Sequence, residues 1–378
     1  MDRFLEAAVR LHRYIIDRHW RGGAIVGPDP IGKIHWRVTR FVRSYLAWLP
    51  GDDRYTYMQG QAYWIRGNSN LFGLTQDNRY LELLSHAADR VAQAQLANKA
   101  WEHPPIRGRR GFVSAVETVW ACLGLVASYR DLGDTANLDA AMNGYDALPN
   151  VIGLRPVGDG LAVNYYAHSA YLVPNVSTMF LWLLAELWQV TGEDRYLQYA
   201  PGLSRFLEAS QMANGELHYV YRSQPHFQCY QYNSFQFLDL AHYFQITGDQ
   251  KVRPMLTKLA GYLATGVTAR GSCRYSCFRE VPEVSYWGAA LAAALRTAHE
   301  LQLGDYLALS ERAYAYLLAR QRSDGGFDFS TRNYGLLRDG RSYPRYLAMI
   351  LDFLAWRASA LAMRGHSSTR PHIIEQWT

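Results

Sequence analysis

Apolar residues recur every three or four positions along most of the chain, which is the spacing of helices that bury one face. The segment with Tyr196, Tyr199, Leu203 and Leu207 shows this pattern clearly. The pattern predicts twelve helices, near residues 2–20, 55–74, 77–97, 113–130, 135–147, 169–190, 193–213, 231–246, 249–264, 284–302, 305–321 and 343–364.

Five short motifs interrupt this pattern at nearly equal intervals. Each ends one helix with Gly, or with Gln in the first case, and places an acidic residue at the start of the next helix. Their middle residues are 57, 59, 56 and 56 positions apart, which predicts a repeat of helical hairpins. The motifs are Thr75-Gln76-Asp77, Leu132-Gly133-Asp134, Thr191-Gly192-Glu193, Thr247-Gly248-Asp249 and Leu303-Gly304-Asp305.

A second motif closes three of the other helices and is followed by a long loop. It has Gln, then Gly four positions later, then a large apolar residue two positions after that. In the first copy Lys replaces the Gly. The copies are Gln95–Lys99–Trp101, Gln211–Gly215–Leu217 and Gln321–Gly325–Phe327.

Alternating short and long connections between twelve helices favour a closed double ring. Every second helix is apolar on nearly all sides, as 169–190 is, and is expected in the inner ring. We therefore expect an all-α fold, an (α/α)6 toroid of twelve helices spanning residues 1–364 as one domain, with 365–378 as a tail. The alternative is an open helical solenoid that binds other proteins.

Charge is distributed unevenly between the two ends of such a ring. The chain carries a net charge of +6, whereas the six long loops carry 19 basic and 11 acidic residues. This excess favours an anionic ligand. Because the basic residues are spread over all six loops, nucleic acid is not expected as a partner. No apolar run is long enough to span a membrane, and the N-terminus lacks the pattern of a signal peptide, so the expected compartment is the cytoplasm.

No cofactor or metal is expected. Of the four cysteines, Cys122 lies in an apolar helical run, and Cys273 and Cys277 are four residues apart in a loop. His226 and Cys229 are the nearest further ligands, but the spacing matches no standard zinc pattern.

The long loops are rich in Tyr and His, which suits the binding of sugars. Two kinds of chemistry are compatible with their residues. Proton abstraction next to a carboxylate needs an acid and a base, together with groups that neutralise the carboxylate. The acid and base candidates are His168, Tyr166, His226, Tyr230 and Tyr232. The neutralising candidates are Arg279, Arg338, Arg341 and Asn175.

Hydrolysis by paired carboxylates is the other scheme. Its candidates are Glu117, Glu280, Glu283, Asp324 and Asp328, and Asn164 and Tyr165 complete the expected sugar-binding set. Glu117 stands out because its helix is otherwise apolar. Asp324 lies in a Ser-Asp-Gly-Gly sequence that is typical of a turn.

These motifs resemble those of the α/α-toroid enzymes. Terpenoid cyclases have a repeated QxxxGxW motif whose skeleton Gln95, Gln211 and Gln321 share, although the acidic D-x-D-D motif of those cyclases is absent. Trp64-Ile65-Arg66-Gly67 is similar to the W-x-R-G element of unsaturated glucuronyl hydrolases, but lies in a different repeat. As a whole the chain resembles toroid proteins of bacterial exopolysaccharide clusters and the glucuronyl C5-epimerase domain.

The resemblance implies a carbohydrate-active enzyme, and the basic loops indicate a uronate-containing oligosaccharide or polysaccharide as substrate. We expect proton abstraction, by a lyase or an epimerase, or hydrolysis of the glycosidic bond. The alternatives are a terpenoid-cyclase-like enzyme with an aromatic cavity, and a non-catalytic toroid that binds a glycan or a protein.

Overall fold

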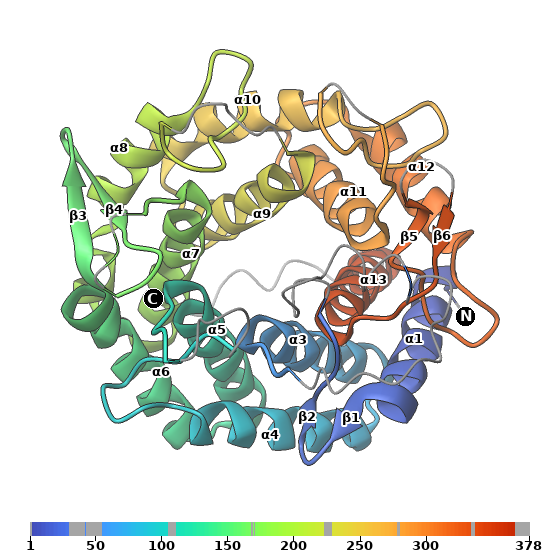
Figure 1. Cartoon of the computed structure of the whole chain (residues 1–378), viewed down its shortest axis with the longest axis horizontal. Coiled ribbons are helices and arrows are strands. Elements are labelled where there is room, and N and C mark those ends of the chain that lie inside the picture. The colour runs from blue at the N-terminus through green and yellow to red at the C-terminus, as the bar shows by residue number, and fades with distance from the viewer. Residues whose placement is uncertain are drawn as a thin grey trace.

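The structure is a computed structural model of the chain, and it describes residues 2–29, 42, 55–104, 111–167, 169, 171–222, 229–277, 280–333 and 337–366. These residues form twelve α-helices in two concentric rings (Figure 1). The inner ring contains α3 (Met58–Thr75), α5 (Ala115–Leu132), α7 (Pro174–Thr191), α9 (Tyr230–Thr247), α11 (Ser285–Glu300) and α13 (Pro344–His366). The outer ring contains α1 (Arg3–His19), α4 (Asn78–Gln93), α6 (Thr135–Ala147), α8 (Ala200–Ser210), α10 (Arg253–Ala264) and α12 (Leu307–Leu318).

The predicted (α/α)6 toroid is therefore confirmed, as is the assignment of alternate helices to the inner ring. Two outer helices start later than predicted, α8 at Ala200 and α10 at Arg253. Short 3-10 segments, Asp194–Leu197 and Gln250–Val252, precede them. Each late helix has a proline in its first turn, where the missing N–H costs nothing.

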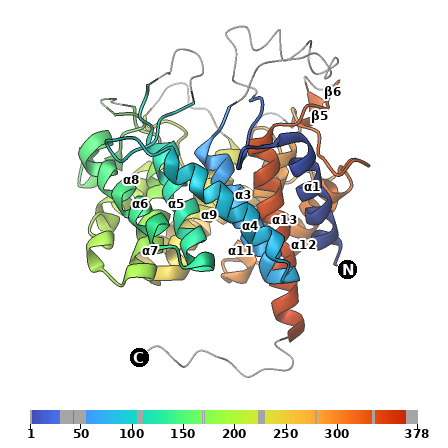
Figure 2. The same cartoon turned by 90° about the horizontal axis from the view of Figure 1, so that it is seen from below.

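Three short antiparallel hairpins, which the sequence pattern did not predict, lie in the long loops. The π-helical segment Leu148–Gly153 leads into the second hairpin. Figure 2 shows β5 and β6 above one end of the helices, while α13 projects beyond the other end. The hairpins are β1 (Trp20–Arg21) with β2 (Ala24–Ile25), β3 (Leu154–Val157) with β4 (Gly160–Val163), and β5 (Ser330–Asn333) with β6 (Leu337–Asp339).

The short turns at the opposite end are built as the motifs predict. Gln76, Gly133, Gly192 and Gly248 each adopt a left-handed conformation directly after an inner helix. In three of these turns the acidic residue that follows accepts a hydrogen bond from the backbone N–H two residues later and caps the next segment. The turns therefore fix each inner helix antiparallel to its outer partner.

The repeated glutamine motif joins neighbouring outer helices. The side-chain amide of Gln211 donates to Gly215 O within its own loop, at 2.9 Å, and to Met255 O of the next outer helix, at 3.0 Å. Gln95 makes the same pair of bonds to Lys99 O and Ala140 O. These glutamines are thus structural, and they hold the hairpins side by side around the ring.

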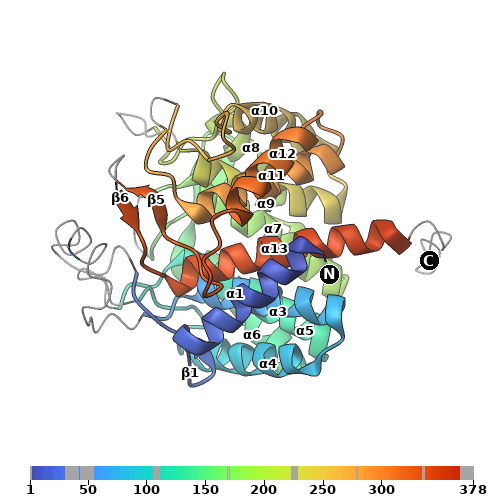
Figure 3. The same cartoon turned by 90° about the vertical axis from the view of Figure 1, so that its right-hand side faces the viewer.

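The last copy of this motif closes the ring. Gln321 donates to Gly325 O and to Ala7 O of α1, which links the last hairpin to the first. A Cβ atom on Gly325 would lie 2.5 Å from Arg10 O, and the backbone there has a φ of +89°, so only glycine fits. Figure 3 shows α1 beside α13, where the two ends of the fold meet.

Candidate functional site

The N-termini of the six inner helices converge at the end of the ring that carries the long loops (Figure 1). Because each helix N-terminus carries a partial positive charge, this arrangement favours anions. Titratable side chains from the starts of α3, α5 and α13 lie close together there, with Asp29 from the segment after β2. We call Asp29, Tyr57, Glu117, Arg345 and Tyr346 the mouth cluster.

Glu117 is the third residue of α5, and its side chain is buried. One carboxylate oxygen accepts a 2.6 Å hydrogen bond from the backbone N–H of Met58, the first residue of α3. Burial raises the pKa of Glu117 to about 7, although the N–H of Met58 and the Arg345 guanidinium both favour the charged form. Glu117 can therefore hold or release a proton near neutral pH.

Arg345 is the second residue of α13 and supplies the positive charge of the mouth cluster. Its Nη2 lies 2.7 Å from Asp29 Oδ2 and donates to the Tyr346 hydroxyl at 2.7 Å. The guanidinium carbon lies 4.1 Å from the ring centre of Tyr57. Arg345 Nε has no hydrogen-bond partner in the described part of the chain, so the guanidinium retains donor capacity.

Two further rings extend the mouth cluster from Tyr57, one packed on the other. The buried ring of His103 packs edge-on against Tyr57, with centroids 6.0 Å apart, and Tyr166 packs against His103 at 6.1 Å. Tyr166 is placed there because its backbone pairs with Ser114, directly before α5. Of the predicted catalytic residues, Glu117 and Tyr166 are therefore brought to one place.

Aromatic side chains of the inner helices pack against one another next to the mouth cluster. Tyr286 and Tyr346 stack face to face with centroids 3.9 Å apart, and Gln231 donates to the Tyr286 hydroxyl at 2.8 Å. Phe235 and Phe353 continue the packing. We call this layer, which also includes Tyr63 and Trp120, the aromatic floor.

Sequence reasoning missed buried carboxyl groups within the inner ring, among them Asp239 and Asp352. Asp239 of α9 is buried and accepts a 2.8 Å hydrogen bond from the Thr178 hydroxyl of α7. Burial raises the pKa of Asp239 to about 8. Its position inside a helix pattern dense in apolar residues was the available signal, because such a carboxylate must face either a partner or the interior.

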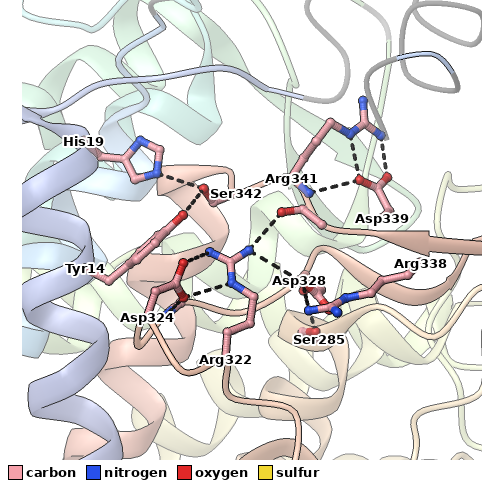
Figure 4. Close-up of polar contacts among 12 residues, drawn as sticks. Tyr14, His19, Ser285, Arg322, Asp324, Asp328, Arg338, Asp339, Arg341 and Ser342 are labelled. Atoms are coloured by element: carbon pink, nitrogen blue, oxygen red, sulfur yellow. Dashed lines mark hydrogen bonds and ion pairs between the residues drawn. The ribbon is translucent and has the colours of Figure 1, made fainter. Parts of the chain in front are cut away.

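The predicted residues of the last loop form a separate network that Figure 4 shows. Asp328 is buried and pairs with both Arg338 and Arg322. Arg341 pairs with the buried Asp339. Asp328 and Arg341 line a small pocket with Tyr286 and Tyr346, so they adjoin the mouth cluster, although both are ion-paired within this loop.

The same network continues to the first helix. Arg322 binds Asp324 and Gly340 O, while Ser342 bonds to Tyr14 and His19 of α1 (Figure 4). These contacts join the last loop to the N-terminal helix. Asp324 lies in a turn, as its Ser-Asp-Gly-Gly sequence predicts, and its side chain accepts from the N–H of Gly326.

Glu280 and Glu283 lie apart from the mouth cluster. Glu283 is buried against α12, where it accepts hydrogen bonds from Arg270, Tyr316 and Thr331. These donors lower the pKa of Glu283, although burial opposes them. Glu280 is exposed and pairs with Arg274 at 3.4 Å. Glu283 thus holds the loop to the outer ring.

Two predicted tyrosines lie at the start of α9. The hydroxyl of Tyr230 bonds to Thr265, and its ring stacks on Tyr262 of α10 with centroids 4.8 Å apart. It therefore points to the outer ring and away from Glu117. Tyr232 packs against Tyr219, with centroids 4.5 Å apart.

The remaining predicted residues belong to the loop before α7 and to its first turn. Asn164 is buried and donates to Ile152 O, which fixes the loop. Tyr165 packs edge-on against Tyr166 with centroids 4.6 Å apart. Asn175, the second residue of α7, has a buried Oδ1 with no partner among the described residues. His168, His226 and Arg279 lie outside the described residues.

The four cysteines are free thiols, and Cys122, Cys229 and Cys273 are buried. Cys277 is close to the hydroxyls of Tyr230 and Tyr262, at 3.5 and 3.6 Å. Within the described ranges, no group of three or more His, Cys, Asp or Glu side chains has the arrangement of a metal site. None of the helices in those ranges combines the length and apolarity that crossing a membrane requires.

Arg345, Asp29, Tyr57 and His103 were missed by sequence reasoning, although two signals were present. Arg345 is the second residue of its inner helix, as are Gln231, Tyr286 and Asn175, so polar residues recur at this register. His103 follows Trp101 of the glutamine motif by two residues.

Solved structures of carbohydrate-active enzymes share this fold. A polysaccharide lyase superimposes with a TM-score of 0.65 at 13% identity, covering 89% of this chain and 98% of its own. Cellobiose 2-epimerase from Bacillus thermoamylovorans gives 0.66 at 14% identity, covering 85% and 99%. A family 76 glycoside hydrolase, a mannosidase from Bacteroides thetaiotaomicron, gives 0.68 at 12% identity, covering 96% and 99%.

No family model matches the sequence, and no curated protein matches it. The chain has the α/α-toroid fold of these lyases, epimerases and glycoside hydrolases, as its helix pattern and motifs indicated. At this level of identity the likeness concerns the fold.

Proposed function

We propose that this protein is an enzyme that acts on a uronate-containing oligosaccharide or polysaccharide. It transfers a proton at C5, the carbon next to the sugar carboxylate, as a lyase or an epimerase does. The observation that carries the proposal is Glu117, a buried carboxyl group with a pKa of about 7 at the mouth of the ring. A group whose pKa is close to the working pH is an effective acid or base catalyst.

The other members of the mouth cluster supply what this reaction needs. Loss of the C5 proton places negative charge on the substrate carboxylate, and Arg345 can stabilise that charge in a site of low dielectric. Asp29 holds the guanidinium before substrate binds. Tyr57, His103 and Tyr166 pack in a row and are the candidate proton donors, to the departing oxygen at C4 in a lyase or to the other face of C5 in an epimerase.

Hydrolysis is the second candidate, favoured by one specific observation. Asp29 and Glu117 are two carboxyl groups around Arg345, and the charge of Asp29 helps to raise the pKa of Glu117. A neutral carboxylic acid beside a carboxylate is the arrangement that glycosidic hydrolysis uses.

The test is incubation of the full chain with a panel of uronate-containing glycans and neutral glycans. A lyase produces a 4,5-unsaturated product that absorbs in the ultraviolet, an epimerase inverts C5, and a hydrolase releases reducing ends without either change. We expect one of the first two outcomes, with kcat/KM rising through an apparent pKa of about 7 as Glu117 ionises. If the uronate panel gives only reducing ends, the proposed proton transfer is wrong and hydrolysis replaces it. If it gives none of these products, a non-catalytic toroid is favoured.

A further inference from the structure

A second pocket opens at the other end of the ring, among the short turns. Its volume is about 320 Å³, within the range of small-molecule sites. Its lining comes from the C-terminal halves of five inner helices and includes Arg66, Arg130, Trp182, His242 and Trp356. Along α5 and α13 the aromatic-floor residues Trp120 and Phe353 come between the mouth cluster and the pocket lining, so the two sites are distinct.

Both arginines that line the short-turn pocket are already paired. Arg130 forms an ion pair with Glu186, which also accepts a 2.6 Å hydrogen bond from Trp182 Nε1. Arg66 lies 3.3 Å from Asp352, whose other oxygen accepts from Asn70. An anionic ligand would have to break one of these pairs, and therefore a neutral ligand fits the arginines better.

Hydrogen-bonding capacity nevertheless remains in the pocket. His242 packs face to face on Trp182, with centroids 4.4 Å apart, and neither of its ring nitrogens bonds to another described residue. Burial lowers the pKa of His242 to about 3, so the ring is neutral and offers one donor and one acceptor. Trp356 adds a half-buried aromatic surface without a hydrogen-bond partner among those residues.

The helix ends add a further preference. Inner helices end at this face, and helix C-termini carry partial negative charge, which favours ligands rich in hydrogen-bond donors. Sugars have many hydroxyl donors and apolar faces that pack on indole rings. We propose that the short-turn pocket binds a neutral sugar residue, either free or at the end of a glycan.

The test is saturation-transfer NMR titration of the full chain with glucose, mannose, galactose and N-acetylglucosamine, and with a short neutral oligosaccharide. We expect a Kd of about 1 mM for at least one of these ligands, as befits a small polar molecule. Ala127→Phe fills the pocket and should abolish binding. His242→Phe keeps the stacking on Trp182 but removes the ring nitrogens, and should weaken binding about fivefold.

Two controls separate this site from the mouth cluster. Ala92→Phe places the same side chain on the outer helix α4 and should bind like wild type, with all variants checked by circular dichroism. Glu117→Gln should also bind the neutral sugar like wild type, whatever its effect on uronate chemistry. The proposal is overturned if no ligand of the panel binds, or if Ala127→Phe binds as tightly as Ala92→Phe.

Discussion

Glu117 shows how one residue can serve both the fold and the chemistry. Its carboxyl group accepts a hydrogen bond from the first backbone N–H of α3, which is the work of a helix cap and by itself lowers a pKa. Complete burial has the larger effect and raises the pKa of Glu117 to about 7. The sequence indicated this residue because its helix is otherwise apolar, but only the structure shows Arg345 and Asp29 beside it.

This balance predicts a pH-dependent effect of Glu117→Gln on stability. The folded-state pKa lies above the unfolded value of 4.5, so ionisation of Glu117 between pH 4.5 and 7 reduces the stability of the wild type. Gln keeps an acceptor for Met58 N–H but cannot ionise. The stability of the variant relative to wild type should therefore be about 2.5 kcal/mol greater at pH 8 than at pH 5.

Urea denaturation of both proteins at the two pH values measures this difference. Other buried groups such as Asp239 titrate in both proteins, and their contributions therefore cancel. If the difference in stability between variant and wild type is the same at pH 5 and pH 8, the pKa of Glu117 is not raised.

At the scale of elements, the sequence was informative wherever a local pattern determines structure. Helix periodicity and the turn motifs predicted the twelve helices seen in the described part of the chain, because each depends on neighbours in the sequence. The late start of α8 was missed because its apolar pattern continues through the 3-10 turn before Pro201. The glutamine motif was recognised, but its bond to the next outer helix depends on residues more than forty positions away.

Gln211→Ala tests the structural role given to this motif. The substitution leaves the carbonyls of Gly215 and Met255 without their donor in a half-buried site and should destabilise the fold by about 1–3 kcal/mol. Gln250→Ala is the matched control, since Gln250 makes one exposed bond within its own turn and its loss should matter little. Chemical denaturation of both variants checks this, and equal effects would contradict the role of Gln211.

At the scale of the whole molecule, closure of the ring decides which residues meet. Arg345 comes from α13, Asp29 from the segment after β2 and Glu117 from α5, and yet they interact. Sequence reasoning predicted a basic, tyrosine-rich mouth, and it placed Glu117 and Tyr166 there. It also included Asp328, Glu283 and Arg341, which the structure places in ion-paired networks that join the loops to α1 and α12.

Residue type alone could not separate these groups. Glu117 and Glu283 both lie near the start of an inner helix and are both buried, but Glu283 is surrounded by Arg270, Tyr316 and Thr331 and stays charged. That distinction depends on which hairpins become neighbours. It becomes visible only once the ring has closed.

The central claim is that Glu117 moves the proton at C5 of a uronate. The most direct measurement is the release of hydrogen isotope into water from a uronate glycan labelled at C5, because elimination and epimerisation both release the label and hydrolysis retains it. We predict release by wild type, a rate at least about 100-fold lower for Glu117→Gln, and a wild-type rate for the exposed control Glu208→Gln. Turnover with the label retained, or release by Glu117→Gln at the wild-type rate, would contradict the account.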